Sequence, residues 1–156
     1  MFKNDLYKIA KARLKNDDDV YDLIQETMII AFKSIKKLEN PLCFKTWIIK
    51  ILISKSNSMY RKKGNSNVIS FDEVENYKLN DYSNIEHAEV ILDFNFICKN
   101  LNHEDRTIIL LYYSERFTDK EIGEILNMKE NTVKTKRTRA KQKIKNIMKK
   151  GDQIYG

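Results

Sequence analysis

The sequence predicts an all-α protein built from two small helical domains joined by a linker. The chain has one proline and four glycines in 156 residues, so it holds few of the residues that interrupt helices. Apolar residues recur at helical spacing along most of its length, and no alternating strand pattern of useful length occurs. The exception is residues 64–84, which lack this periodicity and are rich in Asn, Ser and acids, as linkers are.

The linker divides the chain into a first domain, residues 1–63, and a second domain, residues 85–150, followed by a short tail, residues 151–156. Charge is also distributed unevenly. The chain carries net +7, and both residues 1–63 and residues 106–156 are strongly basic, whereas the middle is acidic. Two basic blocks around an acidic middle favour two modules that face nucleic acid.

Three helices are predicted in the first domain. A short helix contains Leu6, Ile9 and Ala10, and a long second helix, capped by Asn16 or Asp17, has an apolar stripe that extends through Ile35 to Leu38. Asn40 caps the third helix and Pro41 suits its first turn. The apolar stripe of the third helix consists of Phe44, Trp47, Ile48, Ile51 and Leu52.

The end of the third helix, residues 54–63, changes character because polar, aromatic and basic residues interleave there. Such a mixture suits stacking on unpaired bases and contact with phosphates. A frayed, solvated helix end explains this stretch equally well.

The second domain is predicted to contain a fourth helix, residues 85–101, a fifth helix capped by Asn102, and then a helical hairpin. The hairpin covers residues 117–146. Thr118 and Glu121 have the spacing of a capping box, and Asn127 tolerates the left-handed conformation that a sharp turn needs. Helix, short turn and basic helix are the outline of a DNA-binding helix-turn-helix.

Charge separates this interpretation from a simple solvated hairpin. The segment 129–150 contains ten Lys and Arg residues and only one acid, Glu130. Solvated faces usually mix the two signs, so the excess of cations favours nucleic-acid binding.

Other features narrow the class of function. Cys43 and Cys98 lie far apart in apolar helical contexts, so both are expected to be reduced core residues. We expect no cofactor, no metal and no enzyme activity, because no nucleophile–base set, phosphate loop or metal-ligand spacing occurs. Charges fill the first twenty residues and interrupt every apolar run, so a cytoplasmic location is expected.

Two stretches together resemble a known family. The string DDDVYDLIQETMIIAF followed by FKTWIIKILISKSNSMYRKK is similar to region 2 of a bacterial sigma factor, and LNHEDRTIILLYYSERFTDKEIGEILNMKENTVKTKRTRAKQKIK is similar to region 4. With only these regions and a short linker, the chain resembles the extracytoplasmic-function (ECF) group of the sigma-70 family. This implies a promoter-specificity subunit that binds core RNA polymerase, recognises minus-ten and minus-thirty-five elements and promotes transcription initiation.

The resemblance also implies a role for individual residues. Residues matching the polymerase-docking helix of the family are Asp18, Asp19, Asp22, Gln25, Glu26 and Thr27. Residues matching its minus-ten surface are Asn40, Lys50, Lys55, Asn57, Tyr60, Arg61, Lys62 and Lys63. Trp47 is a further candidate there, although its stripe position favours the core.

In the same way, the family's second region-4 helix docks in the major groove of the minus-thirty-five element. Base contacts are expected from Glu130, Asn131, Thr132, Lys134, Thr135 and Thr138. Phosphate contacts are expected from Lys136, Arg137, Arg139, Lys141 and Lys143. Arg137 interrupts the apolar stripe of this helix and is expected to reach outward to phosphate.

The chain departs from the family pattern in region 2. It begins inside that region, and Ser54 and Ser58 stand where the family often has Asn and Asp. Two alternatives therefore stay open: a helix-turn-helix regulator that acts without polymerase, and a degenerate sigma-like protein that binds polymerase without initiating. An anti-sigma factor is a further partner that the family implies and that no residue here identifies.

Overall fold

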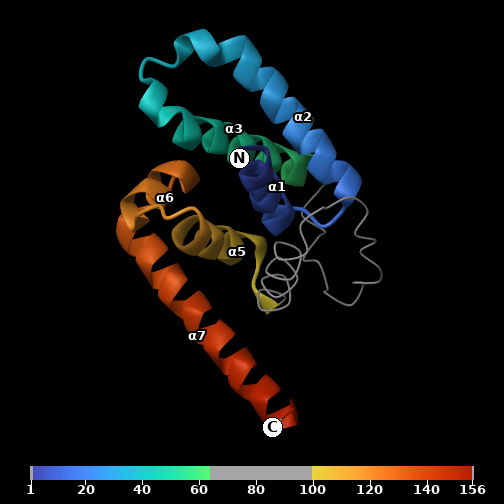
Figure 1. The fold of residues 1–156 in the computed structure, drawn as a ribbon, viewed down its shortest axis with the longest axis vertical. Helices are drawn as coiled ribbons and strands as arrows, with labels where there is room; N and C mark the ends of the chain where they lie inside the picture. Colours follow the sequence, from blue (N-terminus) through green and yellow to red (C-terminus); the bar gives the residue numbers. More distant parts are fainter. Residues whose placement is uncertain (1, 64–99, 156) are drawn as a thin grey trace.

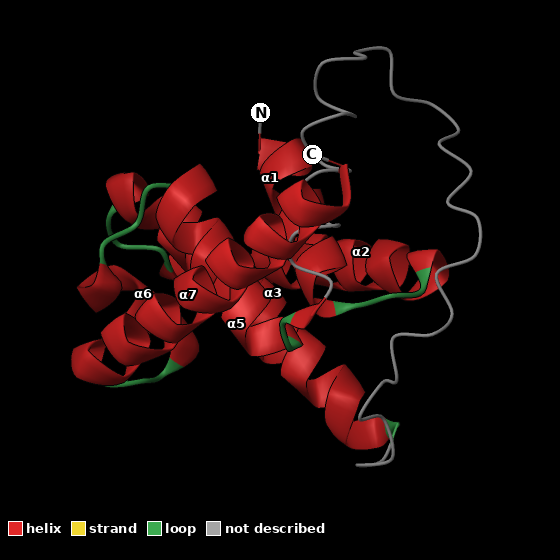
Figure 2. Ribbon diagram, turned by 90° about the horizontal axis from the view of Figure 1, so that it is seen from below, coloured by secondary structure: helices red, strands yellow, loops and turns green. Residues whose placement is uncertain are grey.

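The computed structural model describes residues 2–63 and 100–155, so the predicted linker and most of the predicted fourth helix lie outside the described residues. Within these two ranges every regular element is helical (Figure 2). The all-α prediction is therefore confirmed for the part of the chain that the structure describes.

The first range contains three helices, α1 (Phe2–Arg13), α2 (Asp17–Ser34) and α3 (Phe44–Lys62). Helices α2 and α3 lie side by side, and α1 packs across both near the ends that lie away from the α2–α3 connection (Figure 1). The side chain of Asn16 accepts a hydrogen bond from the backbone N–H of Asp18 at 2.8 Å, which confirms the predicted cap of α2.

The connection between α2 and α3 differs from the prediction. The 3₁₀ turn Ile35–Lys37 replaces the expected last turn of α2. The 3₁₀ turn Pro41–Cys43 replaces the expected first turn of α3, and it keeps the predicted cap at Asn40 and Pro41 at its first position. Because the chain leaves the helical path at Ser34, the side chain of Ile35 is 41% exposed instead of continuing the core stripe. The expectation that Cys43 lies in the core is wrong, since this residue is exposed within the connection.

The second range begins with α5 (His103–Ile109), which continues into one π-helical turn, Leu110–Ser114. The helical hairpin follows as α6 (Asp119–Leu126) and α7 (Glu130–Tyr155). The predicted hairpin is thus present, and α7 extends beyond it as the longest of the described helices (Figure 1).

The turn between α6 and α7 has the predicted construction. Thr118 and Glu121 form both hydrogen bonds of the capping box, and Asn127 has a left-handed φ of 55°. Gly123 serves the turn itself, because a Cβ on this residue would lie 2.6 Å from the carbonyl oxygen of Met128. Only glycine lets the chain turn back this closely against α6.

The two ranges share one hydrophobic core. Helix α1 contacts α5, and α3 contacts α6. The shared cluster includes Leu6 and Ile9 of α1, Ile49 and Leu52 of α3, Ile108 of α5, Leu111 of the π-helical turn and Ile122 of α6. In this conformation the two predicted domains therefore form a single packed body.

Candidate nucleic-acid and polymerase interface

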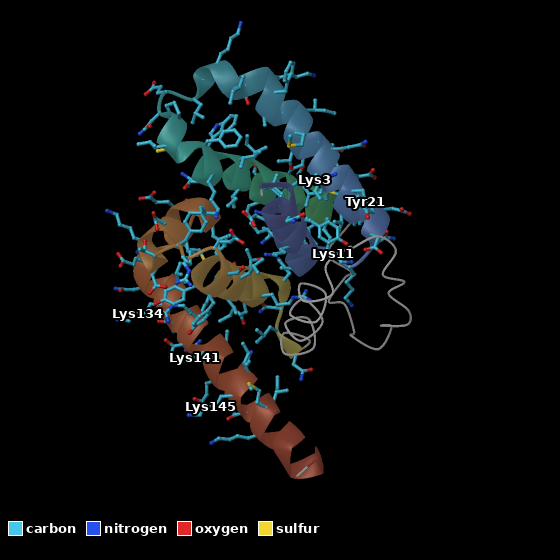
Figure 3. All side chains as sticks on the ribbon, in the orientation of Figure 1. Lys3, Lys11, Tyr21, Lys134, Lys141 and Lys145 are labelled. Carbon is cyan, nitrogen blue, oxygen red and sulfur yellow. The ribbon has the colours of Figure 1, made fainter. Side chains whose placement is uncertain are left out.

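Helix α7 has an uncharged polar face between two rows of cations. At about 100° per residue, exposed Asn131, Thr135 and Thr138 lie along the middle of the solvent side. One flanking row consists of Lys134, Lys141 and Lys145, along one side of α7 (Figure 3). The other row consists of Lys136, Arg139, Lys143 and Lys150. A polar strip between two cationic rows fits a major groove, where base edges lie between two phosphate backbones.

Lys145 was not among the residues predicted from the sequence. Its position follows Lys141 by one helical turn, so it extends the same row of cations. The helical spacing from Lys134 was the signal that could have identified it, because residues four and seven apart lie on one face.

Two of the predicted phosphate ligands, Lys136 and Arg137, instead form ion pairs with residues of α5 and α6. Lys136 Nζ lies 2.7 Å from Glu104 Oε2 of α5. Arg137 donates from Nε and Nη2 to the two carboxylate oxygens of Asp119 at 2.8 Å each, and its guanidinium lies 3.9 Å from the centre of the Tyr112 ring. The expected outward course of Arg137 is therefore wrong in this structure.

This pairing has an electrostatic signature. The hydrogen bond from Arg137 is the main cause that lowers the pKa of Asp119, and the same contact raises the pKa of Arg137. Both side chains are about 15% exposed or less, so solvent screens the pair only in part. The pair fixes α7 against the first turn of α6.

The residues predicted to bind the minus-ten strand lie on different sides of α3. An open groove of about 410 Å³ runs between α2 and α3. It is lined by Ile30, Trp47, Lys50, Ile51, Ser54, Lys55, Ser58 and Arg61. Three predicted cations thus meet in one groove, together with the two serines that depart from the family pattern. Trp47 is half-buried: it packs against the hydrophobic core, as its stripe position predicted, and it also lines this groove.

The predicted residues Asn57 and Tyr60 lie outside the groove. Asn57 is exposed, but its Oδ1 accepts a hydrogen bond from Arg13 Nη2 at 2.5 Å. The Tyr60 hydroxyl donates to the carbonyl oxygen of Arg13, and the Tyr60 ring stacks on His103 at 4.6 Å between centroids. Sequence periodicity cannot show this division, because it depends on where α1 and α5 pack.

The remaining candidates of this set lie at the two ends of α3. Asn40 is exposed and accepts a hydrogen bond from the backbone N–H of Leu42 at 3.0 Å. Leu42 itself is 92% exposed at the tip of the α2–α3 connection. Lys62 and Lys63 are exposed at the far end of α3.

The acidic side of α2 is accessible, with one exception among its predicted residues. Asp18, Asp22 and Gln25 are exposed. Thr27 is fully buried and its hydroxyl donates to the carbonyl oxygen of Leu23, so it does not belong to this surface. Thr27 lies on the core face because it follows Leu23 by one helical turn.

Two salt bridges connect the acidic side of α2 with the basic end of α3. Lys55 pairs with Glu26, and Lys63 pairs with Asp19. The residues assigned to polymerase and to the minus-ten strand are therefore neighbours on one continuous surface.

An exposed apolar stripe on α2 was missed by the sequence analysis. Tyr21, Met28, Phe32 and Ile35 follow one another at helical spacing, and the Phe32 side chain is 84% exposed. The sequence analysis considered only the core-facing stripe and assigned Ile35 to it, although Tyr21, Met28 and Phe32 already shared one face of the predicted helix. Exposed apolar residues gathered on one helix face indicate a protein-binding surface.

Within residues 2–63 and 100–155, no group of three or more His, Cys, Asp or Glu side chains could hold a metal ion. No helix in the same ranges is long and apolar enough to cross a bilayer.

Comparisons with known proteins agree with the division into two regions. The family model of sigma-70 region 2 matches residues 1–66, and that of sigma-70 region 4 matches residues 99–144. Among solved structures, the chain is similar to the sigma factor RpoE of Bartonella quintana in its complex with the anti-sigma factor NepR. The TM-score is 0.72 at 21% identity, over 92% of this chain and 89% of that one. CnrH, in complex with the cytosolic domain of CnrY, gives a TM-score of 0.63 at 17% identity over 94% of this chain and 82% of that chain.

Two sequence relatives share a higher sequence identity with this chain than these solved structures do. The RNA polymerase sigma factor SigV of Bacillus subtilis is 31% identical over 141 residues, which cover 88% of this chain and 81% of SigV. The ECF RNA polymerase sigma factor SigW of the same organism is 28% identical over 156 residues, covering 93% of this chain and 83% of SigW. With both regions matched in order and the helix-turn-helix in place, the chain belongs to the ECF group of the sigma-70 family of RNA polymerase sigma factors.

Proposed function

We propose that this chain is the promoter-specificity subunit of RNA polymerase for one set of promoters, and that it acts by binding and positioning rather than as an enzyme. The observation that carries this most directly is the presence of both DNA-facing surfaces on one chain with an apolar and acidic helix face beside them. A repressor with a helix-turn-helix alone needs neither the α2 surface nor the α2–α3 groove. Its site of action would be the cytoplasm, where the polymerase lies.

At the minus-thirty-five element, α7 enters the major groove. The exposed polar residues Asn131, Thr135 and Thr138 face the base edges, and the cationic rows on either side contact the two phosphate backbones. Lys134, Arg139, Lys141 and Lys143 are free of ion pairs within the described residues and exposed, so they supply the phosphate contacts. Lys136 and Arg137 instead hold the helix in place through Glu104 and Asp119.

At the minus-ten element, the groove between α2 and α3 takes part of the unpaired non-template strand. Trp47 offers a partly exposed aromatic surface for stacking, and Lys50 and Arg61 supply positive charge beside it. Ser54 and Ser58 are smaller and less specific hydrogen-bonding groups than Asn or Asp. The sequence preference in this groove therefore rests more on shape and stacking than on amide or carboxylate contacts.

Core polymerase docks on α2. The acids Asp18 and Asp22 provide charge complementarity to a basic partner surface, which raises the association rate. The stripe of Tyr21, Met28, Phe32 and Ile35 supplies apolar contact area next to them. A combined acidic and apolar surface is more selective than either part alone, because the partner must match both.

Titration of labelled promoter duplex with the chain, with and without core polymerase, tests this function. The promoter fragment is one recovered by transcription-start mapping with the reconstituted enzyme. The chain alone should bind weakly, and core polymerase should make the binding tight and specific. Tight, specific binding by the lone chain would favour the regulator without polymerase.

A further inference from the structure

Two residues other than glycine have a left-handed backbone in the part of the chain that the structure describes. They are Arg116, with φ 59°, and Asn127, with φ 55°. Asn accepts this conformation because its short polar side chain can hydrogen-bond the nearby backbone. Arginine lacks that compensation, so glycine would occupy position 116 with less strain. Strained residues of this kind cluster at functional sites, which raises the question of what the Arg116 side chain binds.

The turn that carries Arg116 is fixed by backbone hydrogen bonds on both sides of it. The N–H of Glu115 donates to the carbonyl oxygen of Leu110 at 3.1 Å. The N–H of Phe117 donates to the carbonyl oxygen of Leu111 at 3.0 Å. Both carbonyls belong to the π-helical turn, so Arg116 is the left-handed residue that closes the end of this turn, a position that glycine commonly takes.

The side chains on either side of Arg116 are turned into the protein. The Glu115 side chain is 3% exposed and pairs with Lys45, and Phe117 packs against the hydrophobic core. Arg116 itself is exposed. It has no ion-pair partner within residues 2–63 and 100–155. Its guanidinium is therefore available to an acidic ligand.

Arg137 holds this turn beside α7 from both directions along the chain. Four residues before Arg116, the ring of Tyr112 lies 3.9 Å from the Arg137 guanidinium. Three residues after Arg116, Asp119 accepts two hydrogen bonds from the same guanidinium. Three residues of chain span at most about 11 Å, so Arg116 lies close to the side of α7 on which Arg137 stands.

That side of α7 also carries two exposed cations proposed to contact phosphates. Lys134 precedes Arg137 by three residues and Lys141 follows it by four, so all three share one side of the helix. Figure 3 shows Lys134 and Lys141 along α7, with Lys145 beyond them. Arg116 therefore continues a row of cations from α7 onto the turn that precedes α6.

We propose that Arg116 binds a phosphate of the DNA strand that Lys134 and Lys141 contact, so that this strand is held from two elements of the chain. The inference rests on the proposed function and adds a phosphate ligand to it. In helix-turn-helix proteins the helix before the reading helix crosses the phosphate backbone, and the turn with Arg116 directly precedes that helix. A guanidinium can offer a phosphate two parallel N–H donors. The contact fixes the position of α7 in the groove and accounts for an arginine where glycine would be less strained.

Substitutions at position 116 separate the charge from the backbone conformation. Arg116→Gly and Arg116→Asn both remove the cation and both suit a left-handed backbone, whereas Arg116→Lys keeps the cation. On a minus-thirty-five duplex, the two neutral variants should reduce the slope of log K against log salt by about 0.9 and weaken binding about fivefold to tenfold near 0.1 M salt. Arg116→Lys should keep the slope of the wild type. Fluorescence anisotropy with the full chain measures all four proteins.

Two controls exclude a structural or general-charge effect. Arg116→Gly should unfold at an equal or higher denaturant concentration than the wild type, because it relieves strain. Lys36→Ala removes one exposed cation outside the helix-turn-helix and should leave the slope nearly unchanged. If the neutral variants at position 116 changed the slope no more than Lys36→Ala does, the proposal would be overturned.

Neutral methylphosphonate linkages, placed one at a time in the duplex, identify the phosphate. At one linkage or two adjacent ones, the substitution should weaken binding of the wild type about fivefold and leave Arg116→Gly nearly unaffected, as in a double-mutant cycle. Equal losses for both proteins at every linkage would contradict the contact. If the coupling appears on promoter and scrambled duplexes alike, and core polymerase adds no preference for the promoter, the Arg116 contact stands and the proposed function fails.

Discussion

At the residue scale, the pair formed by Arg137 and Asp119 shows how a charged residue within an apolar stripe is accommodated. Arg137 interrupts an otherwise apolar stripe, yet the structure neither leaves it in solvent nor buries it alone. Two parallel hydrogen bonds to Asp119 and the face of Tyr112 enclose the guanidinium. The stripe and its interruption were visible in the sequence, but the partner was not, because Asp119 is 18 residues away in the chain.

We predict that Asp119→Ala lowers the free energy of unfolding by about 1–3 kcal/mol, as expected for loss of charge-assisted hydrogen bonds to a partly buried group. Asp119→Asn should cost less, since one hydrogen bond can remain. The lowered pKa of Asp119 fixes the pH dependence. Because the folded pKa lies below the unfolded value of about 3.9, the stabilisation is present above that value and is lost as pH falls through the folded pKa. Denaturant unfolding of wild type and variant between about pH 7 and pH 3 measures this, and a constant difference would contradict it.

His103 gives a second prediction at this scale. Burial, followed by the nearby charge of Arg13, lowers the pKa of His103 to about 4, whereas Glu104 opposes and Arg106 adds to the shift. The ordinary value is about 6.5, so the packed arrangement loses stability as pH falls from 6.5 towards 4, where His103 takes up a proton only when the halves separate. The radius of gyration of the free chain should therefore rise over this range.

His103→Phe is the matched control for this pH dependence. It keeps a ring to stack on Tyr60 and cannot be protonated, so its compactness should be insensitive to pH over the same range. Equal pH responses of wild type and variant would show that another group controls the opening.

At the element scale, α7 combines two tasks that its sequence did not separate. The run of cations predicted DNA binding, and the structure divides the run into residues that face solvent and residues that tie the helix to α5 and α6. Helical periodicity could assign each residue to a side of α7. It could not show which sides other helices cover.

The division of α7 predicts the salt dependence of DNA binding. Lys134→Ala combined with Arg139→Ala removes one exposed cation from each row, and should weaken binding to a minus-thirty-five duplex. Each lost phosphate contact should reduce the slope of log K against log salt by about 0.9, so the pair should reduce it by about 2. Fluorescence anisotropy over a series of salt concentrations measures the slope.

The control for that experiment is Lys3→Ala combined with Lys36→Ala, two exposed cations outside the helix-turn-helix. It changes the net charge equally and should leave the slope nearly unchanged. If both pairs of substitutions reduced the slope to the same extent, the binding would depend on overall charge and not on this face of α7.

At the scale of the whole molecule, the sequence predicted the helices well and their assembly poorly. Caps at Asn16, Thr118 and the left-handed Asn127 were predicted because they depend on residues within four positions. The shared core of α1, α3 and α5 depends on contacts between distant segments, which periodicity does not encode. For the same reason the groove between α2 and α3 was foreseen only as a set of residues, and its separation from Asn57 and Tyr60 was not.

The exposed apolar residues of α2 lead to a prediction about the binding of core polymerase. Phe32→Ala removes a side chain that is 84% exposed, so it should leave the unfolding free energy nearly unchanged. If Phe32 packs against core polymerase, the truncation should weaken the association by about tenfold or more, as for an aromatic residue in the centre of an interface. Competition for core polymerase against the wild-type chain measures this.

Lys37→Ala, an exposed residue in the turn after α2, is the control for general surface change. It should compete as the wild type does. If Phe32→Ala also competed as the wild type does, the apolar stripe would lie outside the docking surface, and the acids of α2 would have to carry the contact alone.

Run-off transcription with purified core polymerase tests the central claim most directly. Core enzyme supplied with this chain should produce defined transcripts from promoters recovered by start-site mapping. Core enzyme alone should produce none. If the chain bound core polymerase and no defined transcript appeared on any template, it would be a sigma-like binding protein and not a promoter-specificity subunit.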